Sequence, residues 1–318
     1  MGTAPHPPDV SVAGELNPDL ILYGLPSELE PERELLADTL SITLGSSSAI
    51  FAHNLSVMGS SVGFVSLIGD DPLGQLALER LAAGGVDVSR VRRKGGTGKT
   101  GLTVVLPRDG FRNILTYPGT MFEMGFDDLD LEFLASAKHF HLSSFFLHRA
   151  LRPRIGELFC RMKNAGLTTS FDTNDDPEDR WEGDVLEVLR HVDVFLPNER
   201  EAKKIAREND LDAAVDTLAS KVPILVVKLG PNGCLVRRGS EDITVPPVRV
   251  EVVDPVGAGD SFDAGFVHKF VAGCDLATCA RWGNLAGAFS TTRPGGTEAF
   301  LDRERLTLFF ARHTSENA

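Results

Sequence analysis

Short apolar runs alternate with amphipathic stretches along most of this 318-residue chain, and this alternation limits the possible folds more than any other feature. Apolar runs of about four to eight residues are typical of buried strands, and longer amphipathic stretches are typical of helices. A strand that is followed each time by a helix predicts a parallel sheet covered on both faces. We therefore expect an α/β fold, a three-layer doubly wound sheet that is mainly parallel.

The pattern predicts the individual elements as follows. Buried strands are expected at 62–68, 139–143, 168–172, 193–196 and 224–229, and helices at 73–83, 151–165, 183–190, 198–220, 258–272, 275–291 and 303–312. Strand-like segments without helices at 20–24, 39–44, 102–106 and 111–117 predict a small separate sheet, with a hairpin turn at 107–110. One domain is expected over 10–312, with a β lid from about 20–44 and 102–117 and flexible ends at 1–9 and 313–318.

Charge and composition exclude several classes of partner. The formal net charge is −13 and the pI is about 5.1, so the surface should repel phosphate backbones and anionic lipid. The four cysteines have no metal-like pairing, and four free thiols suit a reducing compartment. The N-terminus does not resemble a signal peptide, and no apolar run reaches the roughly 18 residues of a membrane span. We expect a cytoplasmic protein without nucleic-acid or membrane partners.

One glycine-rich stretch, 95–100, is similar to a phosphate-binding P-loop but lacks its context. The Walker pattern needs a glycine five residues before Gly98, and that position is Arg93. The pattern must also lead into a helix, whereas the residues that follow predict a strand. We therefore expect a flexible link into the small sheet.

The segment that is most informative about chemistry is 253–266. Three small residues, Gly257, Ala258 and Gly259, precede Asp260 at the start of an expected helix. Small side chains let unpaired backbone N–H groups approach an anion at the positive end of the helix dipole. A carboxylate beside such a loop is suited to accept the proton of a substrate hydroxyl during phosphoryl transfer. The alternative is an ordinary helix with Asp260 as its N-cap.

This segment resembles the C-terminal signature of the ribokinase-like, or PfkB-type, carbohydrate kinases, and the resemblance extends over nearly the whole chain. Segments 14–19, 45–59, 198–201 and 230–233 are similar to further motifs of that family, in the family's order. The resemblance implies an ATP-dependent kinase that phosphorylates a hydroxyl of a small sugar, with Mg²⁺ as cofactor. It leaves a requirement for K⁺ open.

The same resemblance implies a role for each matching residue. Asp260 is the base, and Gly257, Ala258 and Gly259 form the anion hole. The residues expected to hold the sugar are Asn17, Asp19, Gly45 and Ser46. Those expected to hold the nucleotide are Asn198, Lys228, Gly230, Asn232, Gly233 and Asn284, and Glu201 is expected to hold Mg²⁺ through water. A monovalent cation is expected to be held by Asp254, Val256, Thr291, Pro294 and Gly296. Asp172-Thr173-Asn174 resembles a strand-end motif near the phosphates. For Lys228, contact with a phosphate and exposure to solvent are both open.

The substrate motifs depart from the family pattern. Ser46 replaces the second of two glycines, and Ile50 replaces an Asn, so one sugar contact is lost or is supplied by nearby serines. Asn17 and Asp19 are two apart on an expected strand and should face the same way. The stretch 10–60 has no Lys and one Arg, Arg33, and the obvious cation of the lid is Arg112. We therefore expect a neutral sugar first, a sugar acid second and a phosphosugar last.

Other functions remain in consideration. A sugar-acid kinase of the 2-keto-3-deoxygluconate type is favoured by the resemblance of 254–257 to those enzymes. A nucleoside kinase would need an aromatic clamp, for which Tyr23 and Phe51 are candidates. A sugar-binding regulatory protein would not need the intact Asp260 and Glu201. A dinucleotide oxidoreductase is excluded, since no Gly-x-Gly-x-x-Gly follows the first strand. The lid offers a surface for a homodimer, and His139 and His141 are expected in the core.

Overall fold

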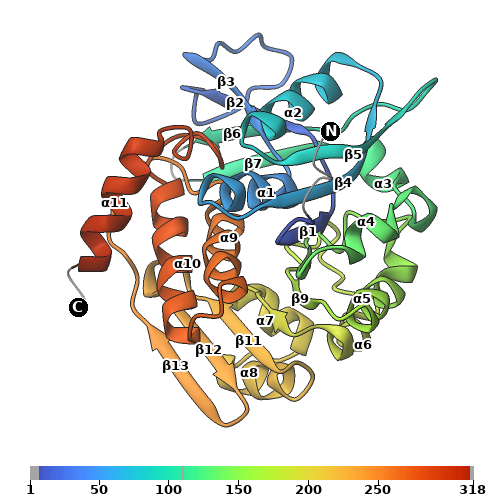
Figure 1. Ribbon diagram of the computed structural model, residues 1–318. Coiled ribbons are helices and arrows are strands. Elements are labelled where there is room, and N and C mark those ends of the chain that lie inside the picture. The colour runs from blue at the N-terminus through green and yellow to red at the C-terminus, as the bar shows by residue number, and fades with distance from the viewer. Residues whose placement is uncertain (1–6, 109–110, 316–318) are drawn as a thin grey trace.

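Nine strands form the central sheet of the computed structural model, which describes residues 7–108 and 111–315 (Figure 1). Their order across the sheet is β13 (Glu241–Val245), β12 (Cys234–Arg238), β11 (Ile224–Lys228), β10 (Val194–Phe195), β9 (Thr168–Phe171), β8 (His139–Leu142), β1 (Val10–Ala13), β4 (Val62–Gly69) and β5 (Asp87–Lys94). The pairs from β11 to β5 are parallel, and β12 and β13 add an antiparallel edge. The predicted α/β class is confirmed.

Helices pack on both faces of this sheet (Figure 1). One face is covered by α4 (Leu131–Ala135), α5 (Ile155–Asn164), α6 (Val185–Val188), α7 (Glu199–Ala206) and α8 (Leu211–Ala219). The other face is covered by α1 (Ser47–Val57), α2 (Pro72–Ala83), α9 (Ala258–Val271) and α10 (Leu276–Ser290), with α11 (Arg303–Ser315) packed on α10. The short α3 (Thr120–Glu123) and the 3-10 helices η1 (Phe126–Asp128), η2 (Arg152–Arg154), η3 (Leu189–His191) and η4 (Gly230–Asn232) lie in the connections.

A second, four-stranded sheet stands apart from the first, as the sequence predicts. Its order is β3 (Thr39–Leu44), β2 (Pro18–Tyr23), β6 (Leu102–Arg108) and β7 (Phe111–Tyr117). The stretch 95–100 leads into β6, a strand, so the P-loop interpretation is excluded. The central residues of the predicted turn, 109–110, lie outside the described residues. That this sheet closes as a lid stays a prediction.

Four strands of the central sheet were not predicted, and one helix was predicted too long. β5 is mostly exposed and charged, so it lacks the apolar signature of a strand. β12 and β13 pair through a tight turn at Gly239, and β1 is only four residues long. The expected helix at 198–220 is two helices, because Arg207 takes a left-handed conformation (φ 59°) and Asp210 caps α8.

The core is aromatic near the middle of the sheet, and the predicted place of two histidines is confirmed. His139 and His141 are fully buried on β8, and Phe51 of α1 stacks on His141 with ring centroids 3.7 Å apart. None of the helices in the described part of the chain is long and apolar enough to span a bilayer. A cytoplasmic location stays a prediction.

Candidate active site

The loop before α9 is shaped by Gly257 and Asp254. Gly257 has a φ of 72°, and a Cβ at this position would lie 2.6 Å from the Cα of Gly296. Only glycine fits so close to another backbone in this conformation. The Asp254 carboxylate accepts hydrogen bonds from the amides of Val256 and Gly295, each 2.9 Å long. Asp254 therefore ties the loop before α9 to the loop after α10.

Asp260 lies in the first turn of α9 and is buried. Its Oδ1 accepts a hydrogen bond from Nδ2 of Asn174 (3.2 Å). Burial raises the pKa of Asp260 to about 6, and the charge of Asp172 adds to the rise, while Lys228 and hydrogen bonds from Asn174 and Ser47 oppose it. A carboxylate whose pKa is close to the working pH is an effective general base.

The amide of Asn174 is oriented by the loop after β8. Its Oδ1 accepts a hydrogen bond from the backbone N–H of Ser144 (2.9 Å), which leaves Nδ2 to face Asp260. Asn174 and Ser144 both have left-handed backbone conformations, with φ of 52° and 57°. Such conformations cost free energy in non-glycine residues and cluster at functional sites. The sequence motif at 172–174 was expected near the phosphates, and its contact with Asp260 was not anticipated.

Lys228 does not point to solvent, and its contact with a phosphate stays a prediction. Its ammonium is buried, 2.6 Å from Oδ2 of Asp172 and 3.1 Å from Oδ1 of Asp263. Burial alone would lower the pKa of Lys228, but Asp172, Asp263 and Glu201 raise it above its ordinary value. Lys228 is therefore charged. Burial, in turn, raises the pKa of Asp263 well above its usual range.

Asn198 and Glu201 form a reciprocal cap at the start of α7. The Asn198 side chain accepts a hydrogen bond from the Glu201 amide (2.9 Å), and Glu201 Oε2 accepts one from the Asn198 amide (2.8 Å). Glu201 is 5% exposed, so it is not the solvated residue of an ordinary cap. Burial raises its pKa to about 8, and the charge of Asp172 adds to the rise.

The expected sugar-binding residues meet between the small sheet and α1. Ser46 Oγ donates a hydrogen bond to Oδ1 of Asn17 (2.5 Å) and accepts one from the Asn17 amide (2.9 Å). Asn17 lies just before β2, and Asp19 lies within it, so they do not share one strand as expected. A Cβ on Gly45 would lie 2.0 Å from Oδ1 of Asp19, so glycine leaves room for that carboxylate. Burial raises the pKa of Asp19 to about 7, with Asp260 contributing.

Glu15, which the sequence placed in a motif without a role, is the centre of a buried polar group. Its carboxylate accepts hydrogen bonds from the hydroxyls of Ser144 (2.7 Å) and Ser48 (2.8 Å) and lies 3.2 Å from Nε2 of His148. Burial alone would raise the pKa of Glu15, but His148 and Ser144 hold it below its ordinary value. Glu15 therefore braces the Ser144 loop that orients Asn174.

The other expected nucleotide residues lie in the turn after β11 and in α10. Gly230 and Asn232 lie in η4, the turn between β11 and β12, and Gly233 follows it. Asn284 is buried in α10, where its Nδ2 donates hydrogen bonds to the carbonyls of Val245 (3.2 Å) and Pro246 (2.9 Å). Asn284 therefore fixes the segment after β13 and is not an exposed helical residue.

The remaining predicted site residues are in two places. Thr291, Pro294 and Gly296 lie at and after the end of α10. The Thr291 carbonyl accepts hydrogen bonds from the amides of residues 253 (2.8 Å) and 254 (3.1 Å). The Gly296 carbonyl accepts one from the side chain of Asn54 (2.9 Å). Arg112 lies on β7 and is exposed. Tyr23 of β2 donates a hydrogen bond to Asp254 (3.3 Å), which connects the small sheet with the loop before α9.

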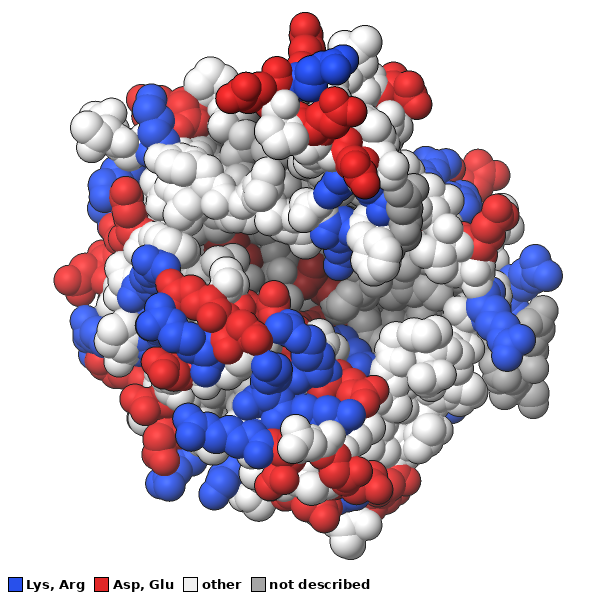
Figure 2. Space-filling model, turned by 180° about the vertical axis from the view of Figure 1, so that it is seen from behind, with Lys and Arg blue, Asp and Glu red and all other residues white. Residues whose placement is uncertain are grey.

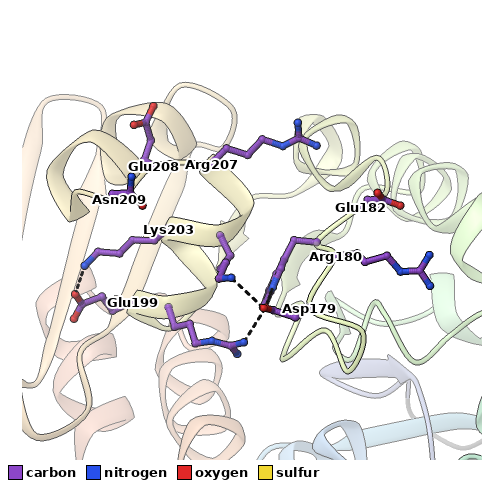
Figure 3. Close-up of a pocket in the computed structure, with 11 residues that line it drawn as sticks. Asp179, Arg180, Glu182, Glu199, Lys203, Arg207, Glu208 and Asn209 are labelled. Carbon is purple, nitrogen blue, oxygen red and sulfur yellow. Dashed lines mark hydrogen bonds and ion pairs between the residues drawn. The ribbon is translucent and has the colours of Figure 1, made fainter.

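A groove with a volume of about 780 Å³ lies between α7 and the segment 179–182 (Figure 3). Asp179 accepts hydrogen bonds from Arg200 (3.0 Å), Lys204 (3.2 Å) and Nε1 of Trp181 (2.6 Å), and Lys203 pairs with Glu199. The cationic side chains that line this groove are thus largely neutralised by carboxylates of the groove itself, and we assign the groove no ligand.

Figure 2 shows one face of the molecule hollowed at its centre, with acidic side chains at the bottom of the hollow.

Comparison with known proteins identifies related sequences over nearly the same range. Residues 8–303 match the family described as pfkB family carbohydrate kinase. An uncharacterized sugar kinase of Archaeoglobus fulgidus is 31% identical over 77% of this chain and 96% of its own length. An ATP-dependent ribose-1-phosphate kinase of Halopiger xanaduensis is 30% identical over 80% of this chain and 82% of its own. A 2-dehydro-3-deoxygluconokinase of Bacillus subtilis is 27% identical over 86% and 88%.

Solved structures share the fold. Arabidopsis thaliana ribokinase, complexed with ribose and ATP, superposes with a TM-score of 0.80 at 24% identity and covers 95% of this chain and 98% of its own. A putative ribokinase II from E. coli, in complex with ATP and Mg²⁺, superposes with a TM-score of 0.81 at 24% identity and covers 96% and 100%. These likenesses show the ribokinase-like fold.

Proposed function

Because the chain belongs to the PfkB family of carbohydrate kinases, we propose that it transfers the γ-phosphoryl group of ATP to a hydroxyl of a small sugar. The observation that carries this proposal is the position of the buried Asp260 in the first turn of α9. This helix begins directly after Gly257, which has a left-handed backbone conformation. Asp260 accepts the proton of the acceptor hydroxyl as the hydroxyl oxygen attacks the γ-phosphorus and ADP leaves. Backbone amides at 257–259 hold the charge of the transferring group, and that of Ala258 also donates to the Pro255 carbonyl (3.3 Å).

The nucleotide is proposed to lie along η4 and the N-termini of α7 and α9, with its adenine near Asn284. The donor set fits Mg²⁺, which prefers carboxylate oxygens and water. Glu201 is buried, and its raised pKa, about 8, means that a nearby cation would stabilise its ionised form. When bound, Mg²⁺ neutralises charge on the phosphates. A K⁺ site would be formed by the loop around Asp254 and the carbonyls near Thr291.

Among the described residues no group of three or more His, Cys, Asp or Glu side chains is arranged to hold a metal ion. A magnesium ion bound mainly through water and phosphate oxygens agrees with this arrangement.

For the acceptor, the chemistry around Asp19 favours hydroxyl groups. Asp19, Asn17 and Ser46 offer carboxylate, amide and hydroxyl groups within one small region, which suits vicinal hydroxyls of a sugar. The relatives named as a deoxygluconokinase and a ribose-1-phosphate kinase keep a sugar acid and a phosphosugar as alternatives. A nucleoside is disfavoured, because Phe51 is 1% exposed in the core and the Tyr23 hydroxyl is bonded to Asp254.

A coupled ADP-release assay tests this function. Purified protein with ATP and Mg²⁺ is given neutral sugars, sugar acids, phosphosugars and nucleosides in turn, and product mass identifies the phosphorylated compound. We expect acceptor-dependent ADP release with at least one neutral sugar. Release with no acceptor of any class, together with sugar binding by calorimetry, would favour the sugar-binding regulatory protein.

We also propose that the protein forms a homodimer through the small sheet. On the face opposite to Asp19, the cross-strand neighbours Leu22 and Leu40, and Val104 and Leu115, form an apolar surface. Leu40 and Leu115 are each 58% exposed, and contiguous exposed apolar patches mark interaction surfaces. Sedimentation equilibrium should give twice the chain mass of 34.4 kDa, and Leu115→Glu should give the monomer mass.

A further inference from the structure

Lys228 ends β11 with its ammonium group between two buried carboxylates. Its Nζ is 2.6 Å from Oδ2 of Asp172 and 3.1 and 3.2 Å from the two carboxylate oxygens of Asp263. The three side chains are 10%, 1% and 2% exposed in the order Lys228, Asp172, Asp263. Water therefore screens the charges of this cluster weakly, and they act strongly on neighbouring groups.

The cluster lies next to the proposed anion hole. A Cβ built on Gly259 would lie 3.5 Å from Nζ of Lys228. Asp263 follows Asp260 by three residues on α9, so the two carboxylates lie on the same side of that helix. A fixed positive charge is thus held beside the loop that would receive the phosphoryl group.

A second connection runs through Asp172. Its Oδ1 accepts a hydrogen bond from the backbone N–H of Asn174 (3.0 Å), while its Oδ2 accepts one from Lys228. Asn174 in turn donates to Asp260. Lys228 therefore holds the carboxylate that shapes the turn from which Asn174 reaches Asp260.

We propose that Lys228 is a positioning residue: its ammonium fixes Asp172 and Asp263, and its charge together with that of Asp172 sets how readily Asp260 accepts a proton. The proposal rests on the proposed kinase function for its catalytic consequence only. Its electrostatic consequence belongs to the folded protein and can be measured without any substrate.

The charges that face Asp260 come from several elements. Asp172 at the end of β9 and Lys228 of β11 have opposite effects on the pKa of Asp260, and Asp19 of β2 and Asp263 of α9 are also coupled to it. Removing the Lys228 charge should raise the pKa of Asp260, and removing the Asp172 charge should lower it. Removing both should leave it near its original value. A cluster that serves only stability predicts no such pair of opposite shifts.

The test is a carboxyl-carbon NMR titration of protein labelled at the aspartate side chains, with Asp260→Asn used to assign the Asp260 signal. The variants are Lys228→Met, Asp172→Asn and the double variant. We expect the Asp260 midpoint to move up by roughly one pH unit in the first and down by roughly one in the second. In the double variant it should return to within about half a unit of wild type.

A matched control is Lys163→Met. Lys163 is paired with Asp193 (2.6 Å) just before β10, at the opposite end of the parallel strands from Asp260. This variant loses the same charge from an ion pair, and its Asp260 midpoint should equal that of wild type.

Two results would overturn the proposal: equal Asp260 midpoints in wild type and both single variants, or shifts in the same direction. Breaking a buried pair can prevent folding, and if Lys228→Met does not fold, Asp172→Asn and the double variant still decide the sign. Kinetics separate this inference from the function. Opposite NMR shifts without any kinase activity would reject the proposed function and leave the electrostatic role standing.

Discussion

Asn174 donates a hydrogen bond from Nδ2 to Oδ1 of Asp260, and this 3.2 Å contact joins the end of β9 to the first turn of α9. The amide has no freedom to turn over, because its Oδ1 accepts the backbone N–H of Ser144. Ser144 is held in turn by Glu15. Three segments that are far apart in sequence therefore determine where the Asp260 carboxylate points.

Replacing Asn174 should weaken the base without removing it. Asn174→Gly deletes the hydrogen bond but tolerates the left-handed φ of 52°, whereas Asn174→Ala deletes it and adds backbone strain. We expect both variants to lose about tenfold in kcat, since a hydrogen bond to a charged group contributes roughly 1.5–3 kcal/mol. Thermal unfolding separates the two: the Ala variant should melt at a lower temperature than the Gly variant. Wild-type kcat in Asn174→Gly would exclude the positioning role.

Asp260→Asn should abolish phosphoryl transfer while ATP affinity stays within a few-fold of wild type. The substitution keeps the shape of the side chain and the backbone amides of 257–259, and it removes the proton acceptor. General-base effects are typically about 10²–10⁴-fold, so turnover above about a tenth of wild type would contradict the assignment. Initial rates and calorimetric ATP binding measure the two quantities on the same preparation.

Activity should fall on the acid side of neutrality. Asp260 must be ionised to accept a proton, and its pKa is raised to about 6, so kcat/KM should drop about tenfold for each pH unit below that value. Burial and the charge of Asp260 raise the pKa of Asp19 to about 7, so Asp19 is largely protonated and uncharged in the pH range where Asp260 titrates. Asp19→Asn should therefore raise KM for the acceptor and leave the acid limb nearly in place. A limb that moves by about a full pH unit would show that Asp19 keeps its charge in that range.

Much of the fold could be predicted because its signals are local. Apolar runs mark β4, β8, β9 and β11, and the hairpin turn and strand pattern mark the small sheet. Asp260 was found for the same reason, since small residues before a helix form a continuous motif. β5 was missed because an exposed, charged edge strand has no apolar pattern.

The contacts within the site could not be predicted, because they join distant residues. Asp260 and Asn174 are 86 positions apart, and Lys228 is 56 from Asp172 and 35 from Asp263. Sequence patterns report which residue types are present near a motif and carry little information on pairing across the sheet. For Lys228 the sequence leaves contact with a phosphate and exposure to solvent open, and it gives no sign of the buried ion pairs with Asp172 and Asp263 for this reason.

Gly257→Ala should inactivate the enzyme more than strain alone explains. Gly257 and Gly273 both have positive φ, 72° and 78°, but a Cβ on Gly257 would lie 2.6 Å from Gly296, whereas a Cβ on Gly273 meets nothing within 4 Å. Gly273→Ala therefore controls for backbone strain, which is about 1 kcal/mol or more. We expect a lower melting temperature in both variants and a kcat loss of at least tenfold in Gly257→Ala alone. Equal kcat values would contradict the anion-hole role.

The last prediction concerns the charge of the acceptor. A dianionic phosphate is generally held by several Lys or Arg side chains. Arg33, the one cation in 10–60, is 69% exposed and paired with Glu30. On the small sheet, the alternation of β6 and β7 puts Arg112 on the same face as Asp19. One arginine can serve a carboxylate, so a neutral sugar should be the best acceptor, a sugar acid second and a phosphosugar last.

Arg112→Ala separates these classes. With a neutral sugar, kcat/KM should stay within about twofold of wild type, because no charge is lost from a contact that the sugar needs. With a sugar acid it should fall about tenfold, as expected for one charge-assisted hydrogen bond. Steady-state kinetics over matched neutral, acidic and phosphorylated sugars measure both effects. The order would be reversed by a phosphorylated sugar whose kcat/KM is at least tenfold above that of every neutral sugar and sugar acid. Cations outside 10–60 and β7 would then have to hold the phosphate.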